Sequence, residues 1–230
     1  MWPISILFIV LVIFIGVRTA RARARKIKAS VGELAAALGF EVLQGREAVR
    51  RMIPEASAPR AMQDYEKLPG PLRRLLEAAV GTFCIAGRVD GVAVVIFTVS
   101  RGGGKSQTTY TVVRADYPTP LPIDVRIAHE GTLTRLGKAL FGLSDVEIGD
   151  PEFDRAVRIK AKEADAGRAK VLLGSTNTRA AILRMLAVSE SAFATQTYAQ
   201  WERQGRRFDV AEMRTVIGAL VPVARALCKS

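Results

Sequence analysis

The sequence predicts an α+β protein in which an N-terminal transmembrane helix is followed by a largely antiparallel sheet packed with helices. Three observations lead to this prediction. An uncharged apolar run opens the chain, β-like segments joined by short turns occupy its middle, and helical patterns flank them without strict βαβ alternation. The 230 residues are 49% hydrophobic and 24% charged, which is typical of one globular domain with an anchor.

The apolar run extends from Trp2 to Val17 and contains no charged side chain. As a helix it spans about 24 Å, slightly less than the roughly 30 Å of a hydrocarbon core, and Thr19 and Ala20 extend it. We therefore expect a transmembrane helix over residues 1–20. A cleaved signal peptide is the alternative, but it would carry its positive charge before the apolar run.

Basic side chains follow the run directly, and no acidic residue precedes Glu33. They are Arg18, Arg21, Arg23, Arg25, Lys26 and Lys28, and they account for half of the formal net charge of +12. Positive residues stay on the cytosolic side of a membrane. We expect a basic juxtamembrane segment at 21–30 and a cytosolic domain at 31–230, in a single-pass cell-membrane protein with its N-terminus outside. The six residues are predicted to set this topology or, in addition, to contact lipid headgroups.

Two helical patterns begin the domain. Leu34, Ala35 and Leu38 share a helix face that ends at Gly39, and a shorter pattern runs from Arg46 to before Pro54. Residues 54–70 are rich in proline and predict a surface loop, after which Pro71 opens another helix.

The middle of the chain predicts an antiparallel meander. Residues 83–89 and 92–100 are β-like and flank Asp90-Gly91, a dipeptide that supplies the positive φ angles of a tight hairpin. Glycines at 102–104 turn the chain into a third strand at 107–115. Beyond a proline-rich turn at 118–122, alternation of apolar and charged residues at 123–127 predicts a fourth strand.

The remaining segments mix helices with β structure. Thr132 can cap a helix, and the acidic segment 145–154 is predicted to be a turn before a strand at 157–161. Helical patterns follow at 165–173 and 178–186, and 193–201 is one β-like segment. Asp209 and Glu212 form a capping-box variant that opens a C-terminal helix, which Pro222 is expected to kink or shorten.

Several motifs fall short of a catalytic or metal site. Residues 103–106 (GGKS) resemble the end of a P-loop, but the required earlier glycine is replaced by Val99 and a strand is expected to follow. His129 is the single histidine and is predicted to lie at the edge of the core, with a catalytic or pH-sensing role as the alternative. Cys84 and Cys228 have no metal-ligand or redox spacing.

The densest acidic patch comprises Asp145, Glu147, Asp150, Glu152 and Asp154. Its spacing does not match a calcium-binding loop, so we interpret it as a solvated turn that balances the basic face at 158–162. We expect no metal, no cofactor and no catalytic residue. Nucleic-acid binding is not expected either, because the basic residues of the domain are scattered and no nucleic-acid module is recognised.

The segment from Gly149 to Leu173 opens with an acidic turn, formed by Asp150, Phe153 and Asp154, before a strand and a helix. With the hairpin at 87–91, which is similar to the preceding region, this segment resembles a bacterial membrane-tethered protein family of unknown function. The resemblance implies no catalytic residues.

Two functional hypotheses follow. The favoured one is an uncharacterised, non-enzymatic binding or scaffold module at the membrane surface, with membrane lipids and an unknown protein as partners. The alternative is an enzyme with an unrecognised site, such as a metal-assisted hydrolase that uses the patch at Asp145 to Asp154.

Overall fold

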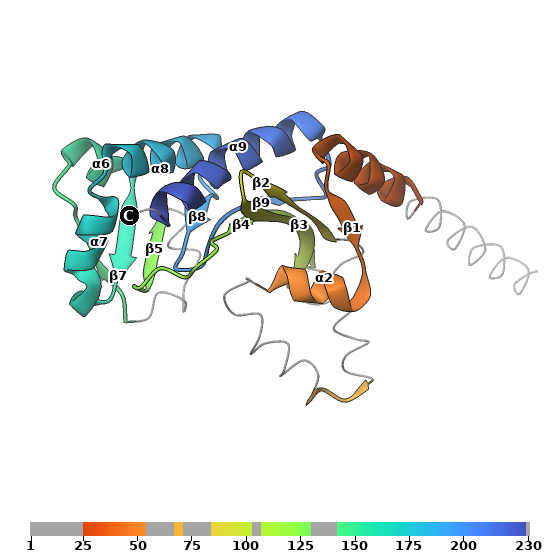
Figure 1. Ribbon diagram of the computed structural model, residues 1–230, viewed down its shortest axis with the longest axis horizontal. Helices are drawn as coiled ribbons and strands as arrows, with labels where there is room; N and C mark the ends of the chain where they lie inside the picture. Colours follow the sequence, from red (N-terminus) through yellow and green to blue (C-terminus); the bar gives the residue numbers. More distant parts are fainter. Residues whose placement is uncertain (1–24, 54–66, 71–83, 103–106, 130–141, 229–230) are drawn as a thin grey trace, which may run out of the picture.

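A nine-stranded antiparallel sheet forms the centre of the protein (Figure 1), in the order β1-β2-β3-β4-β9-β8-β5-β7-β6. The structure, a computed structural model, describes residues 25–53, 67–70, 84–102, 107–129 and 142–228. Within these residues the predicted antiparallel sheet packed with helices is confirmed. The strands are β1 (Glu41–Leu43), β2 (Cys84–Val89), β3 (Val92–Arg101), β4 (Thr108–Asp116), β5 (Val125–Ala128), β6 (Ser144–Asp145), β7 (Arg158–Ala161), β8 (Phe193–Ala194) and β9 (Tyr198–Gln204).

The turn between β2 and β3 forms as predicted. Asp90 and Gly91 both have positive φ, at 50° and 80°, as a tight two-residue hairpin requires. The register of β2 and β3 extends from the Val89–Val92 pair next to this turn to the far end of β2, and β4 pairs with β3 along its whole length. The predicted three-stranded meander is therefore confirmed.

The second half of the sheet has more strands than the sequence predicts. The β-like segment at 193–201 is two strands, β8 and β9, because Thr195 Oγ1 accepts hydrogen bonds from the backbone of Thr197 at 3.2 Å and Tyr198 at 3.3 Å and so turns the chain. These strands separate β4 from β5, since β9 pairs with β4 and β8 pairs with β5.

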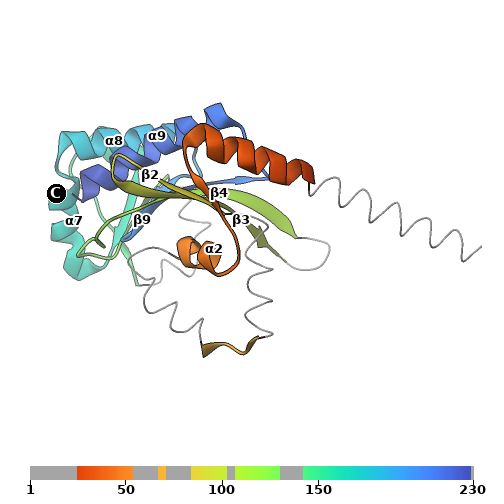
Figure 2. The ribbon, with the colours of Figure 1, turned by 45° about the vertical axis from the view of Figure 1, so that its right-hand side comes forward.

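Helices cover the two faces of the sheet unequally (Figures 1 and 2). The helix at 25–38 lies with α8 and α9 on one face, whereas α2 lies on the opposite face. Buried apolar side chains of these three helices and of the strands form the main core, and Ala48 of α2 joins a smaller cluster with Cys84 and Phe97. The labelled helical elements are α2 (Gly45–Met52), α6 (Pro151–Ala156), η4 (Glu163–Asp165), α7 (Ala166–Leu173), α8 (Thr176–Val188) and α9 (Val210–Leu227).

The predicted cap of α9 is present. The Asp209 side chain accepts a hydrogen bond from the backbone N–H of Glu212 at 2.7 Å, which satisfies one of the free donors of the first turn. Pro222 lies inside α9, and the helix continues beyond it to Leu227. Of the two expected effects of Pro222, the shortening is therefore wrong and the kink stays a prediction.

The predicted transmembrane helix requires a correction. None of the helices that the structure describes combines the length and the apolar character needed to cross a membrane. The longest labelled helix, α9, has 18 residues but carries Glu212, Arg214 and Arg225, and charged side chains are costly inside a bilayer. The expectation of a transmembrane, single-pass protein is therefore corrected: the described fold is an antiparallel sheet with helices, none of which could span a membrane. The predicted span at 1–20 itself lies outside the described residues.

The acidic segment contains more regular structure than the predicted turn. Asp150 caps the short helix α6 by accepting the backbone N–H of Phe153 at 3.2 Å, and Pro151 occupies the first helical position. Ser144 and Asp145 form the edge strand β6. The predicted helices at Pro71 and Thr132, and the GGKS turn at 103–106, lie outside the described residues.

Candidate functional site

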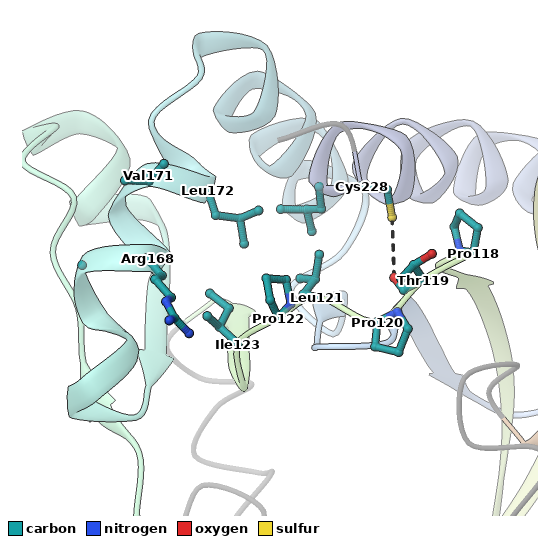
Figure 3. A pocket seen from close by; sticks show the side chains of 12 residues that line it. Pro118, Thr119, Pro120, Leu121, Pro122, Ile123, Arg168, Val171, Leu172 and Cys228 are labelled. Atoms are coloured by element: carbon teal, nitrogen blue, oxygen red, sulfur yellow. Dashed lines mark hydrogen bonds between the residues drawn. The ribbon is translucent and has the colours of Figure 1, made fainter.

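An apolar pocket of about 540 Å³ opens where the β4–β5 connection meets α7 and the end of α9 (Figure 3). This volume is within the roughly 300–1,000 Å³ of typical small-molecule sites. The pocket is lined by Pro118, Thr119, Pro120, Leu121, Pro122, Ile123, Gly167, Arg168, Val171, Leu172, Leu227 and Cys228.

The proline-rich segment at 118–123 forms one wall of the pocket and does not join the sheet. Its prolines lack the backbone N–H that a central strand must donate. The β8–β9 turn fixes it instead, since Leu121 N–H donates to Gln196 O at 2.8 Å and Gln196 Nε2 donates to Leu121 O at 3.0 Å. Leu121 and Ile123 are buried, so the apolar wall is held rigidly.

The opposite wall comes from α7 (Figure 3). Leu172 is buried, and Val171, the next residue along this helix, is 81% exposed at the pocket. Val171 is the most exposed large apolar side chain among the described residues. A single exposed apolar residue is ordinary, but one at the edge of an apolar pocket extends the apolar surface toward solvent.

The pocket offers one cation and one thiol. The Arg168 guanidinium, 70% exposed, lies 3.7 Å from Asp165, a contact that solvent weakens. The Cys228 thiol points at Thr119 O, 4.0 Å away (Figure 3), and burial raises the pKa of this thiol. Because the thiol stays protonated at neutral pH, it is a poor nucleophile. These side chains suit the binding of an amphipathic molecule better than covalent chemistry.

The acidic patch is used within the fold. Asp145 lies 3.2 Å from Lys160, which agrees with the expectation that the patch balances this basic face. Asp154 accepts the backbone N–H groups of Ile148 and Gly149 at 3.0 and 2.9 Å. Asp150 caps α6 and also lies 3.2 Å from Arg179. Across the described part of the chain, no three metal-ligating side chains converge. The alternative of a metal-assisted hydrolase stays a prediction.

Only three of the six basic residues predicted to set the topology belong to the part of the chain that the structure describes. Arg25, Lys26 and Lys28 are exposed on the helix at 25–38, while Arg18, Arg21 and Arg23 lie outside the described residues. The roles predicted for all six stay predictions, as does the division of the chain at residues 20 and 30. His129 follows β5, is half-buried, and has a buried Nδ1 without a hydrogen-bond partner among the residues that the structure describes. It lies apart from the residues that line the pocket.

A buried ion pair on the α2 face was not anticipated from the sequence. Arg114 of β4 contacts Asp116 through two hydrogen bonds of 2.6 and 3.1 Å, and both side chains are almost fully buried. Arg114 also donates to the backbone carbonyls of Arg51 and Met52 at the end of α2. Since these bonds occupy the guanidinium, Arg114 anchors α2 to the sheet and is not a free binding group.

Sequence reasoning also missed the pocket. Residues 118–122 were predicted to be a turn, and nothing in their local pattern shows that α7 and the end of α9 lie beside them. The exposed Val171 is a weak signal, because a sequence pattern alone does not reveal which residue of a mixed helix is uncovered.

Comparison with known proteins supports the fold alone. No family model and no curated protein matches this chain. A solved structure, the crystal structure of the mycobacterial trehalose monomycolate transport factor A, TtfA, matches with a TM-score of 0.52 and 11% sequence identity, over 88% of this chain and 95% of that one. The resemblance to a bacterial membrane-tethered family stays a prediction, since this likeness concerns the fold. The described fold is one that a bacterial protein also adopts.

Proposed function

We propose that this chain is a non-enzymatic binding module that takes the apolar chain of an amphipathic ligand into the pocket between 118–123 and α7. The observation that carries the proposal is the position of Val171, an 81% exposed side chain on an apolar pocket of about 540 Å³. Covering this surface with another apolar group removes it from water, which favours binding by about 25 cal/mol per Å².

The charge at the pocket selects the polar part of the ligand. Arg168 is the one side chain that is charged at neutral pH among the residues that line the pocket. A guanidinium pairs well with a carboxylate or phosphate. The expected ligand is therefore a fatty-acid-like molecule or a lipid with an anionic headgroup.

The structural neighbour is compatible with this proposal. TtfA is named as a transport factor, and a protein that assists transport can bind its cargo without changing it chemically. The favoured hypothesis of a binding module near a membrane surface also agrees with a protein that binds its ligand without changing it chemically. At 11% identity the likeness supports the fold, so the ligand must be tested on this chain directly.

Gly167 allows the pocket to be filled without disturbing the fold. It lies in α7 and lines the pocket, and a Cβ added at this position meets no heavy atom within 4 Å. Gly167→Leu therefore adds a side chain in open space. Replacing a helical glycine also stabilises a fold by about 0.5–1 kcal/mol, so lost binding would not be explained by unfolding.

The test is a fluorescence titration of the full chain with a dansyl-labelled fatty acid. We expect Gly167→Leu to weaken binding by about tenfold or more, which corresponds to at least about 1.4 kcal/mol. Gly32→Leu is the matched control, because Gly32 is an exposed position on the helix at 25–38 with equal space for a Cβ. The proposal fails if the two variants bind the probe with the affinity of the parent.

A second variant tests the headgroup. Arg168→Gln is expected to weaken binding of the fatty acid a few-fold, since the guanidinium is largely exposed and its charge is screened. Binding of an uncharged fatty-alcohol probe should be unchanged. Equal losses for both probes would show that Arg168 acts through packing and not through its charge.

A further inference from the structure

Two segments that are far apart in the sequence lie side by side at the end of the molecule opposite the pocket. One is the helix at 25–38, and the other is the connection at 205–209 between β9 and α9 (Figures 1 and 2). Each carries exposed cationic side chains. These are Arg25, Lys26, Lys28, Arg206 and Arg207, here called the basic surface.

Hydrogen bonds fix the connection at 205–209. Gly205 has a φ of 92°, a conformation that favours glycine, and its N–H donates to Thr109 O at 2.8 Å. Thr111 Oγ1 donates to Gly205 O at 2.8 Å and accepts from the Arg207 N–H at 2.9 Å. The backbone of Arg206 and Arg207 is therefore held while both side chains remain in solvent.

Contacts between α9 and the helix at 25–38 keep the two segments together. Arg214 Nη2 donates to Ala37 O at 2.8 Å. Phe208 and Val210 pack against the core that also contains Val31 and Leu34. The cations of the basic surface consequently belong to one rigid end of the fold.

Most of the acidic side chains near the connection at 205–209 are already engaged, while Glu33 of the helix at 25–38 is exposed. Glu202 accepts two hydrogen bonds of 2.8 Å from Arg101, Glu212 pairs with Arg203, and Asp209 caps α9. Within the described residues, none of the five cations of the basic surface forms a salt bridge. Their charge is therefore available to an external anionic partner.

We propose that the basic surface binds the phosphate-bearing headgroups of an anionic membrane. Clustered lysines and arginines are attracted to anionic lipid because their charges add over a Debye length of about 8–10 Å. The inference goes beyond the pocket and does not depend on it. A membrane at the basic surface leaves the pocket at the far end of the molecule, accessible from the surrounding solution.

Lipid fits this surface better than nucleic acid does. Protein sites for single-stranded nucleic acid combine cations with exposed aromatic side chains on which bases stack. The aromatic residue next to these cations, Phe208, packs against the core instead. The sequence before the helix at 25–38 adds more cations and no acidic residue. The partner is therefore expected to be a surface of repeated negative charges.

The test is flotation of the full chain with vesicles of phosphatidylcholine alone or with about 30 mol% phosphatidylglycerol. The variant Arg206→Gln/Arg207→Gln is expected to lower the affinity for the anionic vesicles by about tenfold. Raising the salt from about 0.05 to 0.5 M should remove most of the preference for them. Binding to the neutral vesicles should be equal for variant and parent.

The matched control removes two cations at the other end of the molecule. Arg155 of α6 and Arg184 of α8 are exposed and form no salt bridge among the described residues. Arg155→Gln/Arg184→Gln has the same net charge as the first variant and should bind anionic vesicles like the parent. Equal losses in both variants would overturn the proposal in favour of net charge alone. Competition by a short RNA together with unchanged vesicle binding in the Arg206/Arg207 variant would assign the surface to nucleic acid.

Discussion

On one face of the sheet, α8, α9 and the helix at 25–38 bury a continuous apolar layer, whereas on the other face α2 lies next to the Arg114–Asp116 pair. The apolar layer depends on many small, non-directional contacts. The α2 face depends on a few directional ones, since Arg114 alone reaches Asp116 and two carbonyls of α2. The two faces should therefore differ in how they respond to a single substitution and to pH.

Breaking the ion pair should have the largest effect. Arg114→Ala leaves Asp116 buried without its partner, which is expected to cost about 3–5 kcal/mol of unfolding free energy. The measurement is chemical denaturation. Arg114→Met/Asp116→Leu is the control, because replacing both charges by apolar groups is often close to neutral. The account of this face would be wrong if the single variant were as stable as the double variant.

A substitution in the apolar layer should cost somewhat less. Leu220 of α9 is buried in the main core, and Leu220→Ala is expected to lower stability by about 2–4 kcal/mol through lost burial and a residual cavity. Val171→Ala on the exposed side of α7 is the control and should change stability by less than about 0.5 kcal/mol. Similar losses of stability in the two variants would show that Val171 and Leu220 contribute equally to the core, which would contradict the difference in their exposure.

The smallest effect is a pH dependence of the α2 face. Burial raises the pKa of Cys84 from 9.0 to about 12, with Arg114 and Arg51 opposing the rise. The unfolded chain thus loses the thiol proton near pH 9 while the folded chain keeps it. Stability from this group is present below about pH 9 and declines toward pH 12, by about 1–2 kcal/mol at pH 10.

Denaturation of the parent and of Cys84→Ala at about pH 8 and pH 10 measures this contribution. The parent should lose more stability than the variant over the interval. Tyrosines with raised pKa, such as Tyr117, affect both proteins alike and cancel in the difference. Equal losses would mean that the Cys84 thiol ionises as readily in the folded protein as in the unfolded chain.

Local chemistry explains which parts of the fold were predictable. The Asp90-Gly91 turn and the Asp209 cap depend on residues within three positions of each other, so the sequence pattern indicates them directly. The insertion of β9 and β8 between β4 and β5 depends on pairing across about 90 residues, as between Tyr110 and Gln204. No local pattern specifies such a partner.

The candidate site was hidden for the same reason. The prolines at 118–122 indicate an irregular connection, and the structure has one there. The pocket forms because Leu172 and Leu227, from helices that are distant in the sequence, lie next to this connection. Arg114 presents a related difficulty. An arginine in a strand is expected to face solvent, and only its distant partners at the end of α2 explain its burial.

The short strands at the two borders of the sheet limit how copies of this protein can associate. The border strand β1 has three residues and β6 has two, so each exposes few unpaired backbone groups to another chain. Asp145 of β6 is also neutralised by Lys160 within the same molecule. Edge-to-edge growth into larger sheets is thereby disfavoured. Self-association, where it occurs, has to proceed through side-chain surfaces and not through backbone pairing.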